Sequence, residues 1–283
     1  MATIDLEIET RGRVSGGAKS EVVNTLKDCY RHFGSRVPYK IEVLITDSEA
    51  MLRDYLRQEK FKMGIIDDSV EDTICLYDIW KGFPRITISL EKLDSYSKVA
   101  RQGLIRHQAA HSVLHAAMEF RIFKIPDDCK QTAMIKGIEL GALEDAMRKL
   151  SLGVKDCECS QLLVEHGYIN CQMSFAIEWM RPQEEPRSPQ RPVRIDLAQK
   201  FISQILLMKP ILLTHPLMAA PPSKKVDLEK QVALGRRIEE LIYALPPYEQ
   251  QKLLQTANLI ADNLGEDSHA NMETALRHTM GLA

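Results

Sequence analysis

Two histidines with a glutamine between them are the residues whose types and spacing most clearly suggest chemistry. The segment RHQAAH places His107 and His111 four residues apart. On a helix this spacing puts both imidazoles on one face, where they can bind a single Zn²⁺ ion. A carboxylate directly after the first histidine would take a proton from a zinc-bound water, but Gln108 carries an amide, which cannot accept that proton at neutral pH. The sequence therefore predicts a metal site without its general base.

A third histidine extends this series. His115 follows His111 by four residues, and we expect one helix over about residues 97–119 to carry all three histidines. Three apolar residues share their face: Leu104, Leu114 and Met118. The stripe is therefore expected to point inward. Three imidazoles on an apolar face without a metal or hydrogen-bond partners would each cost desolvation energy, so a metal site is favoured over histidines that only pack in a core.

A catalytic zinc ion usually takes a third protein ligand and leaves one position to water. Two glutamates in the next predicted helix, residues 131–152, compete for this role. At about 100° per residue, Glu139 falls within the apolar face of that helix, whereas Glu144 falls nearly opposite it. A carboxylate that points into apolar surroundings needs a positive partner, so Glu139 is the predicted ligand and Glu144 is expected to be solvated. The alternative for Glu139 is a helix-edge position in a salt bridge.

The segment HQAAHSVLH, followed 28 residues after His111 by Glu139 in an E-x-x-A-x-x-x-A frame, resembles the gluzincin-type metallopeptidases. It is most similar to the ImmA/IrrE family. The resemblance covers about residues 95–150. It implies that His107, His111 and Glu139 bind zinc and that position 108 holds the general base.

Two positions depart from the family pattern. Gln108 replaces the base, and Leu143 replaces a small polar residue that would support a histidine. The resemblance thus implies a zinc metallopeptidase that hydrolyses peptide bonds through a metal-activated water, here in an inactive or strongly impaired form. Its expected substrate is a peptide or protein. One alternative is a natural pseudoprotease that binds a peptide or protein as a regulator, and another is a metal hydrolase that acts on other substrates.

A zinc peptidase also needs a donor for the oxyanion of its tetrahedral intermediate. His166 and Tyr168 are the candidates, by their position downstream of the metal helices. His166 also lies among cysteines, Cys157, Cys159 and Cys171, that together suggest a second metal. The C-x-C spacing is tighter than that of a usual zinc knuckle, so we expect reduced cysteines there instead.

Upstream of the histidines, alternating apolar and polar residues predict strands at 3–9 and 40–46, with an amphipathic helix between them at about 18–33. A second helix is expected at about 48–62. Two further strand-like runs, CLYDIW and PRITISLEKL, lead into the histidine helix. Residues 86–90 can form either an edge strand that pairs with extended substrate or an ordinary sheet strand.

The chain downstream of the metal helices is expected to be mainly helical, with helices at about 160–180, 195–208, 226–244, 247–263 and 267–280. Four prolines and alternating charge predict an exposed loop at 181–194. Residues 209–225 are apolar and interrupted by prolines, which suits a core cover or a lid. The predicted fold class is α+β: a zincin-like lobe at 1–153, with a small mixed sheet and the metal helices, and a helical lobe at 154–283.

Composition limits the remaining possibilities. With 283 residues, 45% of them hydrophobic, the chain can bury a substantial core. No apolar run approaches the roughly 18 to 20 residues that span a bilayer, and the first residues lack a signal pattern, so we expect a cytoplasmic protein with reduced cysteines and no membrane association. A net charge of −2 gives no global reason to expect a nucleic-acid partner.

Overall fold

The computed structural model describes residues 5–64, 75–79, 81–181 and 197–282. They form an α+β structure with two compact units, Met1–Met118 and Glu119–Ala283. Unit 1 holds a small mixed sheet with its helices, and unit 2 is helical throughout its described residues. The unit boundary differs from the predicted one after residue 153, which falls inside a continuous helix of unit 2.

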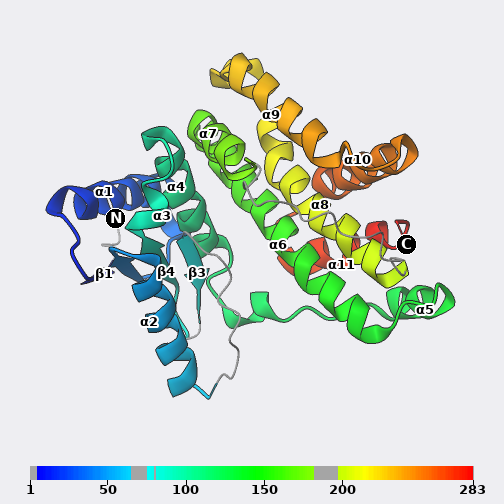
Figure 1. Cartoon of the computed structure of the whole chain (residues 1–283), viewed down its shortest axis with the longest axis horizontal. Helices are drawn as coiled ribbons and strands as arrows, with labels where there is room; N and C mark the ends of the chain where they lie inside the picture. Colours follow the sequence, from blue (N-terminus) through cyan, green and yellow to red (C-terminus); the bar gives the residue numbers. More distant parts are fainter. Residues whose placement is uncertain (1–4, 65–74, 80, 182–196, 283) are drawn as a thin grey trace. The chain divides into compact units, whose positions relative to one another are not determined.

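Unit 1 is built on a four-stranded sheet in the order β1-β2-β4-β3 (Figure 1). Three strands run parallel: β1 (Asp5–Arg11), β2 (Lys40–Thr46) and β4 (Arg85–Ser89). The short strand β3 (Cys75–Asp78) pairs antiparallel with β4. The helix α1 (Gly16–Phe33) connects β1 with β2, as the sequence pattern predicted.

Three more α-helices complete unit 1: α2 (Glu49–Lys62), α3 (Leu90–Leu93) and α4 (Lys98–Leu114). A 3₁₀ turn, η1 (Gly34–Arg36), follows α1. A serine caps the start of each long helix by accepting a hydrogen bond from the backbone N–H three residues on, at 3.1 to 3.4 Å. These serines are Ser15, Ser48 and Ser97. The caps help to explain why these helices begin at Gly16, Glu49 and Lys98.

The strand β4 is interior, because β3 occupies the side of it that faces away from β2. All five residues of β4 are buried. The interpretation of residues 86–90 as an edge strand for substrate is therefore wrong, and β4 is an ordinary sheet strand. The edges of the described sheet are β1 and β3.

The two faces of the sheet meet different helices. Tyr77 of β3 lies opposite Ile86 in the register, and its ring stacks on the His111 ring of α4. Arg85, the residue before Ile86 on β4, donates a hydrogen bond of 3.2 Å to the hydroxyl of Tyr55 on α2. Because successive strand residues point to opposite faces, α4 covers one face and α2 the other.

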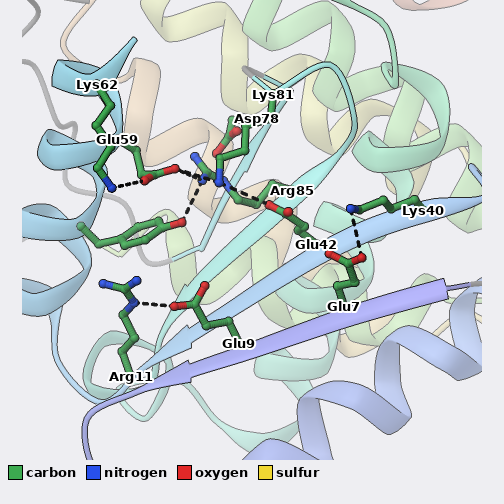
Figure 2. Close-up of polar contacts among 11 residues, drawn as sticks. Glu7, Glu9, Arg11, Lys40, Glu42, Glu59, Lys62, Asp78, Lys81 and Arg85 are labelled. Carbon is green, nitrogen blue, oxygen red and sulfur yellow. Dashed lines mark hydrogen bonds and ion pairs between the residues drawn. The ribbon is translucent and has the colours of Figure 1, made fainter.

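Charged side chains gather on the α2 face (Figure 2). Arg85 is 2% exposed and lies 3.0 Å from Asp78 and 3.5 Å from Glu59. Glu59 also meets Lys81 at 2.8 Å and Lys62 at 3.2 Å. The hydrogen bond from Lys81 is the main reason that the pKa of Glu59 falls to about 2, against the opposing effect of partial burial.

We expect Glu59 to make folding stability depend on pH in acid. A carboxyl group whose pKa is lowered by folding stabilises the folded state above its ordinary pKa of 4.5 and loses that effect as the pH falls toward about 2. The effect is at most about 3 kcal/mol. Denaturant unfolding at several pH values should show a flatter acid limb for Glu59→Gln than for the unmodified chain. The exposed control Glu229→Gln should keep the original slope, and an unchanged slope in Glu59→Gln would contradict the assignment.

Unit 2 consists of seven α-helices and two 3₁₀ turns in its described residues. In chain order they are η2 (Met118–Arg121, which begins at the unit boundary), α5 (Asp127–Ile135), α6 (Leu140–Glu165), α7 (Ile169–Trp179), α8 (Leu197–Met218), η3 (Pro222–Lys224), α9 (Leu228–Ile242), α10 (Pro247–Asp262) and α11 (Ser268–Thr279). Buried apolar residues of α5, α6, α8, α10 and α11 form one hydrophobic cluster. A mainly helical C-terminal part is therefore present, although it begins earlier than predicted.

Two helices predicted as continuous are each interrupted at a glycine. The predicted helix 131–152 is divided between α5 and α6, where Gly137 has φ +72°. The predicted helix 160–180 is divided between α6 and α7, where Gly167 has φ +81°. Side chains with a Cβ rarely adopt this left-handed conformation, so glycine is the residue that ends a helix in this way.

The segment 209–225 was predicted to be a core cover or a lid, but its first residues belong to the helix α8. Pro210 and Pro216 both lie inside α8. Proline costs helix stability, but buried apolar residues on both sides of Pro210 fix α8 in the core of unit 2, among them Phe201, Met208 and Leu212. The loop predicted at 181–194 lies, from residue 182 on, outside the described residues.

The helix α8 is also long and apolar enough, by length and composition, to cross a membrane. Of its most apolar window, 61% is buried within the structure. A core helix of a globular protein satisfies the same criteria, so this property is weak evidence for a membrane span. The prediction that no apolar run approaches the length of a membrane span is therefore wrong for α8.

Gly153 lets α6 approach α8 closely. A Cβ atom at this position would lie 3.1 Å from the Cα of Lys209 and 3.1 Å from a methyl carbon of Leu212. We expect Gly153→Ala to destabilise unit 2 by about 1 kcal/mol, since overpacking costs about 1–3 kcal/mol and the gain in helix propensity returns about 1 kcal/mol. Gly141→Ala, in the same helix with open space around it, should instead stabilise. Urea unfolding of both variants checks this, and a Gly153→Ala variant as stable as Gly141→Ala would contradict it.

Candidate metal centre on the histidine helix

The helix α4 brings the three histidines into one stack. His107 and His111 lie one turn apart, with ring centroids 4.8 Å from each other in a T-shaped arrangement. His115 is the C-cap residue of α4, and its ring centroid lies 5.3 Å from that of His111. His107 is 3% exposed and His115 is 1% exposed, whereas His111 is half-buried. The middle histidine is therefore in contact with both of the others.

The ring nitrogens of neighbouring histidines are close enough to share a metal ion. The Nδ1 atoms of His111 and His115 are 3.2 Å apart, and one ring nitrogen of His107 lies within 4.8 Å of one of His111. Two imidazole nitrogens bound to a tetrahedral zinc ion at about 2.0–2.1 Å are about 3.4 Å apart. The distance between His111 and His115 therefore fits two ligands of one zinc ion, whereas the nitrogens of His107 and His111, within 4.8 Å, would have to move closer if they are farther apart than this. The 3.2 Å distance equally suits a hydrogen bond between two neutral imidazoles.

Tyr77 of β3 supports this stack from the sheet. Its ring lies parallel to that of His111, with centroids 5.9 Å apart and an interplanar angle of 8°. Its hydroxyl donates a hydrogen bond to the backbone carbonyl of His115. Carbonyls at the end of a helix have no partner within the helix, so this bond satisfies one of them. The helix α4 ends at Leu114 and does not continue to residue 119, as was predicted, and Met118 is exposed in η2 instead of pointing inward.

A buried hydrogen bond fixes α4 against α1. The hydroxyl of Tyr30 lies 2.8 Å from Oγ of Ser112, and Ser112 in turn donates to the carbonyl of Ala109 at 2.8 Å. Tyr30 therefore donates to Ser112, the residue that follows His111. This bond restricts rotation of α4 about its axis and so helps to hold the imidazoles in place.

Neither Tyr77 nor Tyr30 was predicted as a site residue. The position of Tyr77 depends on the antiparallel register between β3 and β4, and that of Tyr30 on a contact 82 residues away along the chain. The signal available in the sequence was the alternation of CLYDIW, which places Tyr77 on one face of a strand without indicating which helix covers that face.

Gln108 occupies the position expected for the general base. It follows His107 on α4 and is 9% exposed. Its side-chain amide can donate and accept hydrogen bonds, but it does not take up a proton at neutral pH. The histidine helix therefore places at this position a group with the shape of glutamate and without its basicity.

The predicted third ligand, Glu139, belongs to unit 2. It is the N-cap residue of α6, with extended backbone angles, and its side chain is exposed. The expectation that Glu139 lies within the apolar face of a continuous helix is therefore wrong, because the turn at Gly137 separates α5 from α6. Its role as a ligand stays a prediction. Glu144 is exposed, as expected, and Leu143 is fully buried in the core of unit 2.

The predicted oxyanion donors lie in the turn between α6 and α7. His166 is the C-cap residue of α6, Tyr168 is the N-cap residue of α7, and both side chains are half-buried. Their catalytic role stays a prediction. Cys157, Cys159 and Cys171 are buried thiols. Burial raises the pKa of the Cys157 and Cys159 thiols, which disfavours the thiolate that metals bind.

Comparisons of the chain with protein-family models, with curated proteins and with solved structures found no match.

Proposed function

We propose that this protein is a zinc-binding chain of the metallopeptidase type, in which His107 and His111 hold the metal and Gln108 leaves it without a general base. One observation carries the proposal: both histidines lie on one face of α4, with ring nitrogens within 4.8 Å of each other. Two imidazoles at helical i, i+4 spacing can bind one zinc ion from the same face, and a third protein ligand would come from elsewhere in the chain. A cytoplasmic location and a peptide or protein substrate belong to the same proposal.

A bound zinc ion would supply a Lewis acid that polarises a scissile carbonyl and lowers the pKa of a water ligand toward about 7. The residues of the chain determine what else happens there. Glutamate at position 108 would accept a proton and return it to the leaving amine, whereas the amide of Gln108 can only hydrogen-bond to the reacting groups. Glu139 is proposed as the third ligand, and His166 or Tyr168 as the donor to the oxyanion.

His115 offers a second way to complete the donor set. Its Nδ1 atom lies 3.2 Å from that of His111, so His111 can share a metal with either neighbour. A site that uses His111 and His115 would still be a metal centre with the same i, i+4 spacing, but Ser112 follows its first ligand, whereas a peptidase motif has glutamate at that position. The choice between the two pairs decides whether position 108 adjoins the metal.

The second candidate function is a natural pseudoprotease that binds a peptide or protein without cleaving it. The amide of Gln108 supports it, because this side chain cannot act as a general base. The two functions share the metal centre and differ in whether a general base restores hydrolysis.

Cobalt substitution tests the proposed donor set. Co²⁺ occupies sites built for Zn²⁺, and its visible absorption is far stronger in a four-coordinate protein site than in water. We expect this absorption from the cobalt-loaded chain and its loss in His107→Ala and His111→Ala. The exposed His32 provides the control, because His32→Ala should absorb as the unmodified chain does. Retention of the band in His107→Ala together with its loss in His115→Ala would contradict the peptidase arrangement and assign the metal to the second pair.

A further inference from the structure

The strand β1 exposes one edge of the described sheet. The N–H of Asp5 donates to the carbonyl of Tyr39, and the carbonyl of Arg11 accepts from the N–H of Asp47. Odd-numbered residues of β1 thus direct their backbone groups toward β2. Because these groups alternate along a strand, three residues direct theirs outward: Leu6, Ile8 and Thr10. They form a row of donors and acceptors to which a further strand can be added.

A groove lies beside this edge on the α2 face of the sheet, with a volume of about 230 Å³. Its charged and aromatic lining comes from β1, β2, β4 and α2: Glu7, Glu9, Glu42, Arg85 and Tyr55. Figure 2 labels the charged residues among them. The one cation among them, Arg85, is buried against the carboxylate of Asp78 at 3.0 Å. Tyr55 is 6% exposed, so the polar lining that stays available to a ligand consists of the three carboxylates.

The chain itself shows which group this groove accepts. The guanidinium of Arg11 lies 4.3 Å from the ring centroid of Tyr55, and its Nε atom is 2.7 Å from Glu9. An aromatic face together with a carboxylate is the arrangement that binds guanidinium and ammonium groups. Arg11 lies at the end of β1 beside Glu9, and Glu7 and Glu42 lie farther along the same face (Figure 2).

The carboxylates at the edge can exchange partners. Glu7 pairs with Lys40 at 3.0 Å, and the side chains of Glu7 and Glu9 are 49% and 52% exposed. The nearest ion-pair partner of Glu42, Lys81, is 3.9 Å away and is 2.8 Å from Glu59. The exposed pairs of Glu7 and Glu9 contribute about 0–1 kcal/mol each, so a cation from another molecule can replace their partners at little cost.

We propose that the β1 edge and this groove together bind an extended segment of a partner protein with lysine or arginine at alternate positions. The segment adds a strand to the sheet through the backbone groups of Leu6, Ile8 and Thr10. Its alternate side chains then lie on the α2 face, where the basic groups pair with Glu7 and Glu9 and reach toward Glu42. All of these residues lie on the edge strand or on the face opposite α4, so the site is separate from the histidine stack.

Fluorescence anisotropy with labelled peptides tests this site on the full chain. The probe is a peptide that alternates lysine and valine, and the comparison peptide alternates glutamate and valine. We expect salt-sensitive binding of the lysine peptide only. The triple variant Glu7→Gln/Glu9→Gln/Glu42→Gln should weaken it roughly tenfold or more. The control variant Glu229→Gln/Glu239→Gln/Glu240→Gln, on exposed positions of α9, makes the same change in net charge and should bind as the unmodified chain does.

Methylation of alternate backbone nitrogens in the lysine peptide provides a test that needs no variant. It removes the N–H groups that strand addition requires. The affinity of the methylated peptide for the unmodified chain should therefore fall at least as far as the affinity of the lysine peptide falls in the triple variant. Three results would overturn the proposal: no binding of the lysine peptide, equal binding by the triple variant and the α9 control, or full binding of the methylated peptide.

Discussion

Gln108→Glu is expected to give the zinc-loaded chain peptidase activity that the unmodified chain lacks. The change adds a group that can accept a proton beside His107, and it preserves the length and shape of the side chain. General-base catalysis contributes about 10²–10⁴ in rate, so cleavage of a peptide library or of a protein substrate should rise by a factor in this range. Mass spectrometry of the products measures the gain and identifies the bonds cleaved.

Two control variants define what this result means. Gln108→Asn keeps an amide at the position and should stay inactive, and Gln108→Glu combined with His111→Ala should lose the gain together with the metal. If Gln108→Glu binds zinc and peptides but cleaves neither a peptide library nor itself, the chain is a binding protein. The pseudoprotease hypothesis would then replace the peptidase hypothesis.

Zinc is expected to stabilise unit 1 strongly, because it binds the folded histidine helix and not the unfolded chain. At a free concentration of about 1,000 times the dissociation constant, a ligand stabilises the folded state by about 4 kcal/mol. For a unit of this size the melting temperature should rise by on the order of 10 °C. Thermal melts with zinc and with excess chelator measure the difference.

Single histidine variants identify the ligands in the same melts. His111 contacts both neighbours, so His111→Ala should abolish the zinc-dependent shift. His107→Ala should do the same if the predicted pair binds the metal, and His115→Ala should retain most of the shift. His32→Ala serves as the control with an unchanged shift. A shift that survives in His111→Ala would place the metal elsewhere and contradict the assignment.

The local elements of unit 1 were predictable from the sequence. The strand at Lys40–Thr46 and the helices α1 and α2 follow from alternation and helical periodicity, which are local properties. The i, i+4 spacing of the histidines likewise placed them on one helical face. A small mixed sheet with one antiparallel strand agrees with the predicted α+β class.

The errors arose where distant residues or a single backbone angle decide the structure. Gly137 and Gly167 carry little weight in a periodicity argument, yet each ends a helix, and the first of them moved Glu139 from an apolar face to an exposed cap. The interior position of β4 depends on its pairing with β3, and the contact of Tyr77 with His111 depends on that same register. Pairing between strands is set by tertiary structure, which local patterns do not encode.

The metal content of the purified chain, measured by elemental analysis beside His111→Ala, Glu139→Ala and His32→Ala, is the decisive test of a metal centre on the histidine helix. We expect about one zinc ion per chain in the unmodified protein and in His32→Ala. We expect none in His111→Ala and a reduced content in Glu139→Ala. An unmodified chain that takes up no zinc, or a His111→Ala variant that holds as much as the unmodified chain, would contradict a metal centre on the histidine helix.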